Sequence, residues 1–181
     1  MSPRLNFIVG CTASGKSSLG VELARRTGGE IISIDSMKVY RGMDIGTAKP
    51  SDAVRREVPH HLINVVDPWE DFSVAQYVAL ADRAIEDTHA RGKTIYVVGG
   101  TPLYIKALSE GLFEGPGADP QTRERLQAIA KEQGPPALHE RLQQADPVAA
   151  ERIHRNDLRR LVRALEVYEL TGKPISTLQE Q

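Results

Sequence analysis

One short stretch carries residue types that bind phosphate groups. It reads, in order, Gly10, Cys11, Thr12, Ala13, Ser14, Gly15, Lys16 and Ser17. Glycines let successive backbone N–H groups curl around a phosphate chain, a lysine adds a full positive charge, and a serine hydroxyl can bind Mg²⁺. A chance match is the alternative, but an apolar run at residues 5–9 precedes the stretch and a helical pattern follows it, as a P-loop requires. The stretch therefore predicts a site for a diphosphate or triphosphate.

Two further polar side chains follow apolar runs. Asp35 comes directly after one run, and Thr101 follows another run and two glycines. Ligands of open parallel sheets sit beyond the carboxyl ends of the strands, so both side chains are expected at the edge that carries the P-loop. A P-loop nucleotide hydrolase usually has an acid after this third strand to hold Mg²⁺, and its absence counts against an ATP motor. Thr101 is equally suited to cap a helix that starts at Pro102. A helix cap can also be a hydroxyl at the edge of the site, so both roles can hold.

The elements that position these residues follow from hydrophobic periodicity. Apolar runs predict parallel strands at 5–9, 30–34, 63–66 and 94–98, those at 5–9 and 30–34 being buried. Helical patterns predict helices at 16–27, at 103–108, and between a cap at Ser73 and an end at Gly92. The adjacent His60 and His61 invite a metal-site interpretation, but neighbouring strand residues face opposite ways, which favours a structural role. The composition of 37–50 alone favours a solvated connector over an ordered loop across the site.

The chain changes character near residue 117, after a Gly/Pro-rich hinge. We expect an α/β core at residues 1–117, with a P-loop-type parallel sheet flanked by helices, and an all-helical insertion subdomain at 118–181. Helices are predicted at 120–132, 137–145, 147–153 and 157–170. This part is rich in arginine: Arg123, Arg125, Arg141, Arg152, Arg155, Arg159, Arg160 and Arg163. Composition alone favours a solvated face whose arginines pair with Glu151, Asp157 and Glu166.

Bulk properties restrict the class of protein. The 181 residues carry a formal net charge of −1, so any attraction to nucleic acid must be local. A single cysteine, Cys11, rules out a disulfide framework and fits a reducing, cytoplasmic setting. No apolar run approaches the roughly 20 residues of a membrane span, and the start of the chain leaves no room for a signal peptide. We expect a cytoplasmic monomer with no membrane attachment.

Several motifs together resemble one family, the tRNA dimethylallyltransferases, also called tRNA isopentenyltransferases. Besides the P-loop they are Asp35-Ser-Met-Lys-Val-Tyr-Arg-Gly-Met-Asp-Ile-Gly-Thr-Ala-Lys-Pro50, Gly99-Gly-Thr-Pro-Leu-Tyr104, Arg152-Ile-His-Arg-Asn-Asp157, Arg163-Ala-Leu-Glu-Val-Tyr168 and Thr171-Gly-Lys-Pro174. The resemblance runs over essentially the whole chain. The 35–50 motif is far more specific than the P-loop, and it replaces the connector interpretation of that segment.

The resemblance implies an activity and its residues. Members of the family transfer a dimethylallyl group from dimethylallyl diphosphate to N6 of an adenosine beside the anticodon of tRNA. It implies that Asp35 is the general base, that Thr101 lines the reaction channel, and that Lys16 and Mg²⁺ stabilise the leaving diphosphate. The target base is expected to flip out of its stack. The implied contacts with the anticodon stem-loop are Asp35, Ser36, Met37, Lys38, Thr101, Arg123, Arg159, Arg160, Leu161, Val162 and Arg163.

The chain departs from the family pattern in places. Cys11 stands where bacterial members usually have Pro, Lys38 replaces a usual Gln, and Arg155 replaces a usual Pro. Family members continue well beyond the motif at 171–174, so this chain is expected to be incomplete. Three other functions stay open: a P-loop small-molecule kinase, an adenylate isopentenyltransferase, and an inactive RNA-binding fragment of the prenyltransferase.

Overall fold

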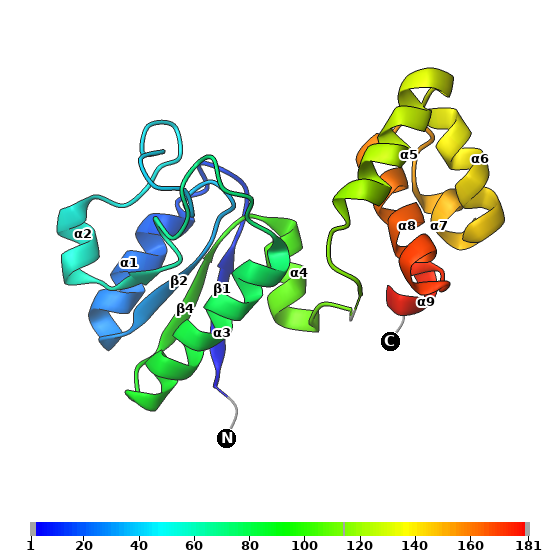
Figure 1. The fold of residues 1–181 in the computed structure, drawn as a ribbon. Coiled ribbons are helices and arrows are strands. Elements are labelled where there is room, and N and C mark those ends of the chain that lie inside the picture. Colours follow the sequence, from blue (N-terminus) through cyan, green and yellow to red (C-terminus); the bar gives the residue numbers. More distant parts are fainter. Residues whose placement is uncertain (1–2, 114, 180–181) are drawn as a thin grey trace. The chain divides into compact units, whose positions relative to one another are not determined.

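The computed structural model of the chain describes residues 3–113 and 115–179. Its N-terminal part is built on a four-stranded sheet in which every paired strand is parallel (Figure 1). The strands are β1 (Leu5–Val9), β2 (Glu30–Ile34), β3 (His60–His61) and β4 (Ile95–Gly99), in the order β1-β4-β2-β3. Because all strands run the same way, the loops that follow them meet at one edge. The expected α/β class with a P-loop-type sheet is confirmed.

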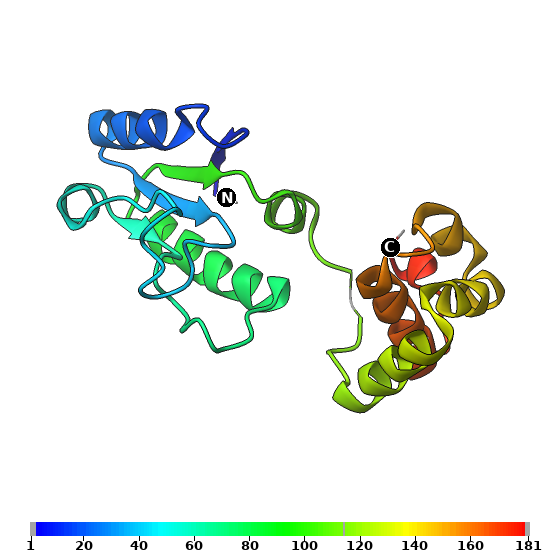
Figure 2. The ribbon, with the colours of Figure 1, turned by 90° about the horizontal axis from the view of Figure 1, so that it is seen from above.

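Helices cover both faces of this sheet. They are α1 (Lys16–Thr27), α2 (Asp52–Glu57), α3 (Val74–Ala90) and α4 (Pro102–Glu110). Figure 2 shows α1 on one side of the strands and α3 on the other. The core on the α1 side contains Ala24, Ile31, Val58, Tyr96 and Val98. The core on the α3 and α4 side contains Ile32, Ile34, Leu62, Tyr77, Ala81, Ile85, Ile95, Val97 and Tyr104. Alternation along β2 and β4 thus divides their side chains between two cores.

Local sequence explains where these helices begin and end. Ser73 and Gln76 form a capping box at the start of α3, each side chain accepting a backbone N–H of the other. Gly28 adopts the left-handed conformation that ends α1. A Cβ on Gly20 would lie 2.8 Å from a methyl of Val98, so a glycine at this position lets α1 approach β4 closely. The predicted helices at 16–27 and after Ser73 are confirmed.

Two strand predictions need correction. The strand at 63–66 is wrong: β3 is His60–His61, and only Val66 forms an isolated bridge, to Tyr40. Leu62 and Asn64 have φ values of 61° and 56°, which break the extended conformation. β1 was expected to be buried, but it lies at the sheet edge, and its side chains are half-buried or exposed. The short helix α2 was not predicted.

The two histidines have separate structural partners, as expected. His60 Nδ1 donates to the Val58 carbonyl at 2.7 Å. His61 Nε2 donates to Glu30 at 2.7 Å, and Arg91 donates to both oxygens of the same buried carboxylate. The hydrogen bonds from Arg91, with a smaller contribution from His61, lower the pKa of Glu30 to about 2 against the penalty of burial. This ion network lies at the amino end of β2, away from the P-loop edge.

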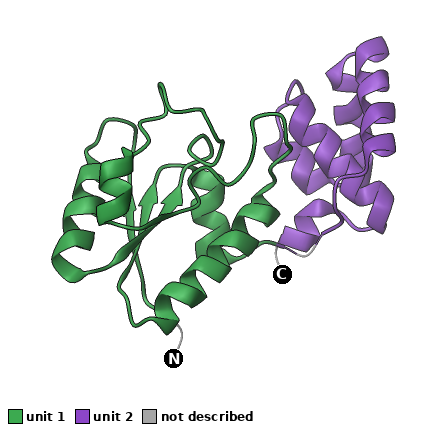
Figure 3. Cartoon of the chain, turned by 60° about the vertical axis from the view of Figure 1, so that its left-hand side comes forward, with its two compact units in different colours: residues 1–112 green, residues 113–181 purple. Residues whose placement is uncertain are grey.

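The chain divides into two compact units, Met1–Leu112 and Phe113–Gln181 (Figure 3). The division falls ahead of the boundary expected after residue 117. Phe113 accounts for the difference, because its ring packs against the core of the second unit. We call these parts the sheet unit and the helical unit and describe each by itself.

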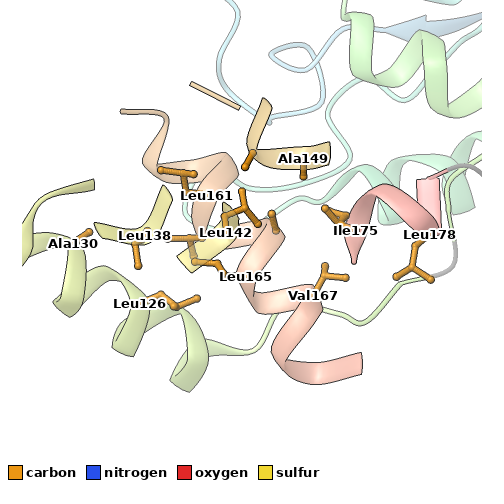
Figure 4. Packing of buried hydrophobic residues seen from close by; sticks show 13 residues of the cluster. Leu126, Ala130, Leu138, Leu142, Ala149, Leu161, Leu165, Val167, Ile175 and Leu178 are labelled. Atoms are coloured by element: carbon orange, nitrogen blue, oxygen red, sulfur yellow. The ribbon is translucent and has the colours of Figure 1, made fainter. Parts of the chain in front are cut away.

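The helical unit consists of α5 (Pro120–Gln133), α6 (Pro135–Ala145), α7 (Pro147–Arg152), α8 (Leu158–Thr171) and α9 (Ile175–Gln179). Figure 4 shows leucines from α5, α6 and α8, among them Leu126, Leu142 and Leu165, meeting in a common core. The helix α9 was not predicted. Buried Asp146 holds its start, because its carboxylate accepts both the N–H and the hydroxyl of Ser176.

Candidate functional site

The carboxyl ends of β1, β2 and β4 meet at two glycines. A Cβ on Gly99 would lie 2.0 Å from the Ile34 carbonyl oxygen, and a Cβ on Gly100 would lie 2.7 Å from the Gly10 carbonyl oxygen. The N–H of Gly100 donates to the Ile34 carbonyl at 3.0 Å. Any side chain at these positions would therefore push the P-loop and the end of β2 away from β4. The sequence indicated only a missing acid here, whereas the structure gives a steric reason for the glycine pair.

The P-loop joins β1 to the amino end of α1. Ala13 and Gly15 both have positive φ values, 65° and 80°, which curl the loop back on itself. Lys16 Nζ donates to the Cys11 carbonyl at 2.8 Å, so the ammonium lies across the loop. Ser17 is exposed in the first turn of the 12-residue helix. A curled backbone, a helix amino terminus and an ammonium group together can hold a phosphate chain.

The segment after β2 forms a compact turn around one carboxylate. Asp35 Oδ1 accepts the N–H groups of Met37 at 2.9 Å and Lys38 at 3.3 Å. Thr101 Oγ1 accepts the N–H of Ser36 at 3.0 Å and donates to the Ser36 hydroxyl at 3.5 Å. Thr101 is the N-cap residue of α4, with Pro102 at the first helical position, as predicted; its carbonyl accepts the Ile105 N–H, but its hydroxyl makes no capping bond. The structure thus brings Asp35, Ser36 and Thr101 together.

Charges of both signs gather at this edge. Burial lowers the pKa of the Lys38 ammonium; the nearby Asp35 carboxylate opposes this, and the Lys16 ammonium adds to it. Burial also raises the pKa of the Tyr104 hydroxyl, with smaller contributions from Tyr40 and Asp35. Asp35 is therefore close enough to interact with Lys38 and with a buried tyrosine. A candidate proton acceptor, Asp35, thus lies near two cations that can bind phosphate, Lys16 and Lys38.

The 35–50 segment is an ordered loop. Residues 38–41 run beside residues 64–66, joined by hydrogen bonds such as that from the Val65 N–H to the Val39 carbonyl at 2.7 Å. Val39 is fully buried, and the ammonium of Lys49 is hydrogen-bonded to the loop and to Asn64. This order agrees with the motif-based interpretation and overturns the composition-based one. Neither Lys49 nor Asn64 stood out in the sequence, because their pairing depends on the folded loop.

A cavity of about 310 Å³ opens beside the P-loop, between α1 and the segment that runs from residue 48 to residue 63. Its lining is mainly apolar and includes Val21, Ile31, Ile63 and Val98; the polar part includes Ser17 and Lys38. The cavity therefore adjoins both the phosphate-binding loop and the turn that carries Asp35. It can accept a small apolar group attached to a bound phosphate. No sequence pattern predicted it, since its walls come from several separate segments.

In the helical unit, two of the predicted RNA-contacting arginines share one buried partner. Arg123 Nε and Arg163 Nη1 each donate to Glu166 at 2.7 Å, and the N–H of Asp119 donates to it at 2.8 Å. Glu166 is fully buried. Burial alone would raise the pKa of Glu166, but the bonds from Arg123 and Arg163 outweigh it and lower that pKa. Arg163 also donates to the Pro116 carbonyl at 2.9 Å, so it ties the linker to α8.

The other predicted contacts on α8 differ among themselves. Arg159 and Arg160 are exposed, and Arg160 makes a long 3.5 Å ion pair with Asp157. The side chains of Leu161 and Val162 are buried in the core of the unit. A surface role for this part of α8 therefore depends on the arginines rather than on the two apolar residues. Within residues 3–113 and 115–179, every helix is too short or too polar to cross a lipid bilayer.

Family models match almost the whole chain. A model described as IPP transferase matches residues 38–181, and one described as isopentenyl transferase matches residues 3–59. The tRNA dimethylallyltransferase of Geobacter metallireducens is 55% identical over 177 residues, which is 98% of this chain and 57% of that relative. The relative from Halorhodospira halophila is 52% identical over 96% of this chain and 56% of its own length. The chain thus spans little more than half the length of the curated relatives it matches.

Solved structures give the same result. The tRNA isopentenylpyrophosphate transferase of Bacillus halodurans is 48% identical and matches with a TM-score of 0.61, over 96% of this chain and 57% of that one. A eukaryotic dimethylallyltransferase acting on tRNA is 35% identical and matches with a TM-score of 0.80, over 99% of this chain and 45% of that one. The motif resemblance, the fold with its P-loop edge and these matches agree. The chain belongs to the IPP transferase family, the family of the tRNA dimethylallyltransferases.

Proposed function

We propose that this chain transfers a dimethylallyl group from dimethylallyl diphosphate to N6 of the adenosine beside the anticodon of tRNA, with release of diphosphate. One observation carries the proposal. A phosphate-binding loop and a carboxylate, Asp35, share one edge of the sheet, and β4 ends at Gly99, followed by Gly100 and Thr101, without the acid by which a nucleotide hydrolase holds its metal. The relatives' names supply the substrates, and the site supplies groups suited to each.

The P-loop is suited to the donor's diphosphate. Backbone N–H groups of residues 10–17 and the Lys16 ammonium would bind the phosphates and stabilise the charge that develops as the C–O bond breaks. The described residues contain no cluster of three His, Cys, Asp or Glu side chains, so a metal would depend on other ligands. Magnesium fits, since it takes few protein ligands and phosphate oxygens, and Ser17 would hold it there. When bound, it would neutralise charge on the leaving diphosphate.

Asp35 is suited to the acceptor. The exocyclic amine of adenosine is weakly basic and must lose a proton as its nitrogen bonds to the prenyl carbon. Oδ1 of Asp35 is committed to two backbone N–H groups, and the same carboxylate would take that proton. The adenosine would have to leave its stack to reach this edge. Thr101 would hold the turn that carries the base, through its bond to the Ser36 N–H.

The cavity beside Ser17 is suited to the five-carbon chain of the donor. Its apolar walls would take the methyl groups, while the adjoining P-loop takes the phosphates. The exposed Arg159 and Arg160 would bind phosphates of the anticodon stem-loop, because guanidinium groups pair with phosphate in a bidentate fashion. The exposed free thiol of Cys11 fits a reducing compartment, and we place the reaction in the cytoplasm.

The experiment incubates the 181-residue chain with labelled dimethylallyl diphosphate, Mg²⁺ and an anticodon stem-loop RNA, beside the G. metallireducens relative as a positive control. Label in N6 of the adenosine beside the anticodon is the expected result. RNA binding without transfer, while the relative is active, would reduce the chain to an RNA-binding part of such an enzyme. Phosphorylation of a small molecule by ATP without prenyl transfer would overturn the proposal in favour of a kinase.

A further inference from the structure

The loop that follows β2 contains a lysine, Lys49, whose side chain is turned away from solvent. The side chain of Lys49 is only 4% exposed, although it belongs to a segment without helix or strand. Its ammonium donates to three oxygens: the Tyr40 carbonyl at 2.5 Å, Asp44 Oδ1 at 2.8 Å and Asn64 Oδ1 at 2.8 Å. An ammonium has three protons, so all of them are used. An ammonium on a side chain this little exposed to water is costly unless it is hydrogen-bonded, so these three acceptors stabilise it in this position.

The three acceptors come from two segments that lie far apart in the sequence. Tyr40 and Asp44 belong to the first half of the loop, whereas Asn64 belongs to the segment after β3. The same two segments are joined by backbone bonds, from the Asn64 N–H to the Lys38 carbonyl at 3.1 Å and from the Arg41 N–H to the Val66 carbonyl at 2.8 Å. Lys49 therefore adds side-chain hydrogen bonds to both of these paired segments.

Strained backbone surrounds the same lysine. Ala48, its neighbour in sequence, has a φ of 49°, and Leu62 and Asn64 have φ values of 61° and 56°. An alanine or leucine in the left-handed region is strained, and such residues persist only where surrounding contacts enforce them. Asparagine tolerates this conformation best, and it is the one whose side chain binds Lys49. The lysine supplies contacts that can hold the strained segments.

These segments form walls of the candidate site. Ala48 and Pro50 flank Lys49, Ile63 precedes Asn64, and all three line the cavity of about 310 Å³. Lys38 lines it as well, and its N–H is bound by the Asp35 carboxylate. The chain from Asp35 to Tyr40 is therefore fixed at one end by Asp35 and Thr101 and at the other by Lys49.

We propose that Lys49 is a positioning residue for the acceptor side of the site. It holds the loop 37–48 and the segment 62–66 together, so that the Asp35 turn and the cavity wall keep one shape, while the P-loop is held independently by α1 and the glycine pair. Removal of the ammonium loosens the acceptor side and leaves diphosphate binding intact. The part that concerns RNA rests on the proposed function; the part that concerns loop order does not.

The test compares Lys49→Met with the unchanged chain. Methionine keeps a long unbranched side chain and removes the charge and its three hydrogen bonds. The matched control is Lys106→Met, which removes an exposed ammonium from α4 in the same unit. Asn64→Asp is the conservative variant, because it keeps an oxygen acceptor for Lys49 in a residue that tolerates positive φ. Each protein is measured by amide hydrogen exchange without ligand, by binding of inorganic diphosphate, and by binding of an anticodon stem-loop RNA.

We expect Lys49→Met to speed exchange at the N–H groups of Arg41, Val65 and Val66 by about tenfold or more. Its affinity for the stem-loop should fall by about tenfold, while its affinity for diphosphate stays within about twofold of the unchanged chain. Lys106→Met and Asn64→Asp should leave the amide exchange rates, the stem-loop affinity and the diphosphate affinity close to those of the unchanged chain. Where the chain transfers prenyl groups, Lys49→Met should raise KM for RNA more than KM for the donor.

Two results would overturn the inference. Unchanged exchange at those amides would show that the ammonium does not hold the loop. A parallel loss of diphosphate and RNA binding would show a general loss of stability instead of positioning. Failure of the proposed function is distinguishable, since it would appear as an unchanged chain that neither binds the stem-loop nor transfers a prenyl group, while the exchange and diphosphate measurements still decide the role of Lys49.

Discussion

The hydroxyl of Thr101 accepts the backbone N–H of Ser36 at 3.0 Å, across 65 positions of sequence. The bond joins the loop after β4 to the turn after β2. Asp35 lies one residue before that N–H and folds its carboxylate over the next two amides. Thr101 therefore fixes the backbone on which the proposed base is carried, and its hydroxyl makes no capping bond to α4.

Replacement of Thr101 tests this relationship. Thr101→Val keeps the shape of the side chain but leaves the Ser36 N–H without its acceptor, which costs about 1–3 kcal/mol where the group stays out of water. We expect the transfer rate to fall by about tenfold, because a small displacement of the Asp35 turn misplaces the base. Thr101→Ser, which keeps the hydroxyl, should stay close to the unchanged chain. Equal rates for the valine and serine variants would remove Thr101 from the positioning of Asp35.

Asp35→Asn separates the base from the turn. The amide oxygen of asparagine can still accept the N–H groups of Met37 and Lys38, so the fold of the turn should survive. An amide cannot take a proton from the acceptor amine, and we expect transfer to fall by about 10²- to 10⁴-fold. Stem-loop affinity, measured in parallel by fluorescence anisotropy, should change little. Turnover near that of the unchanged chain would mean that another group accepts the proton.

The P-loop and Asp35 could be predicted from the sequence because their signals are local. A glycine loop between a strand and a helix, and an acid at the end of an apolar run, need only neighbouring residues and one rule about parallel sheets. The buried positions of Lys49 and Glu166 could not be predicted in this way, although Glu166 was expected to pair with arginines on a solvated face. Lys49 lies in an irregular loop and Glu166 in α8, and the side chain of each is buried only where acceptors or donors from distant segments converge on it.

The errors in the strand predictions have a similar origin. The run Ile63 to Val66 has the composition of a strand, but Asn64 takes a left-handed conformation and binds Lys49, so tertiary contacts override local preference. β1 has the composition of a buried strand but lies at an edge, because the order β1-β4-β2-β3 is decided by pairing and not by hydrophobicity. The number of apolar residues in a run did not reveal its place in the sheet.

The arginines of α8 should separate into two classes. Arg159 and Arg160 are exposed, so their replacement by Ala should weaken stem-loop binding and reduce the slope of log affinity against log salt by about one for each phosphate that the variant no longer binds. These replacements should change the unfolding free energy little, since exposed charges contribute little to stability. The measurement is a salt titration of RNA affinity beside urea unfolding. An unchanged slope would mean that this face is merely solvated.

Arg163→Ala should behave differently. This arginine binds the buried carboxylate of Glu166 and the carbonyl of Pro116, so its loss leaves a buried charge with fewer partners. We expect the helical unit to lose on the order of 1–3 kcal/mol of unfolding free energy. Any loss of RNA affinity should then recover in part at lower temperature, where the unit is folded. A variant with full stability and weaker RNA binding would return Arg163 to the class of direct contacts.

The ion network at the amino end of β2 predicts how the sheet unit responds to acid. Hydrogen bonds from Arg91 and His61 lower the pKa of Glu30 from its ordinary value of 4.5 to about 2, although the carboxylate is buried. A carboxyl group whose pKa is lower in the folded state stabilises the fold at any pH above its pKa in the unfolded state. This stabilisation is lost as the pH falls through the pKa of the folded state. Glu30 should therefore contribute on the order of 3 kcal/mol at neutral pH, and this contribution should disappear between about pH 4.5 and pH 2.

Glu30→Gln tests the argument directly. Urea unfolding at several pH values, followed by the near-ultraviolet circular dichroism of the stacked Tyr77 and Tyr104, reports on the sheet unit. The difference in unfolding free energy between the unchanged chain and the variant should be constant above about pH 5 and should shrink as the pH falls toward 3. Glu86→Gln, which alters an exposed carboxylate of α3, should show no such trend. A difference that stays constant down to pH 3 would mean that hydrogen bonding alone, and not the charge of Glu30, stabilises this end of the sheet.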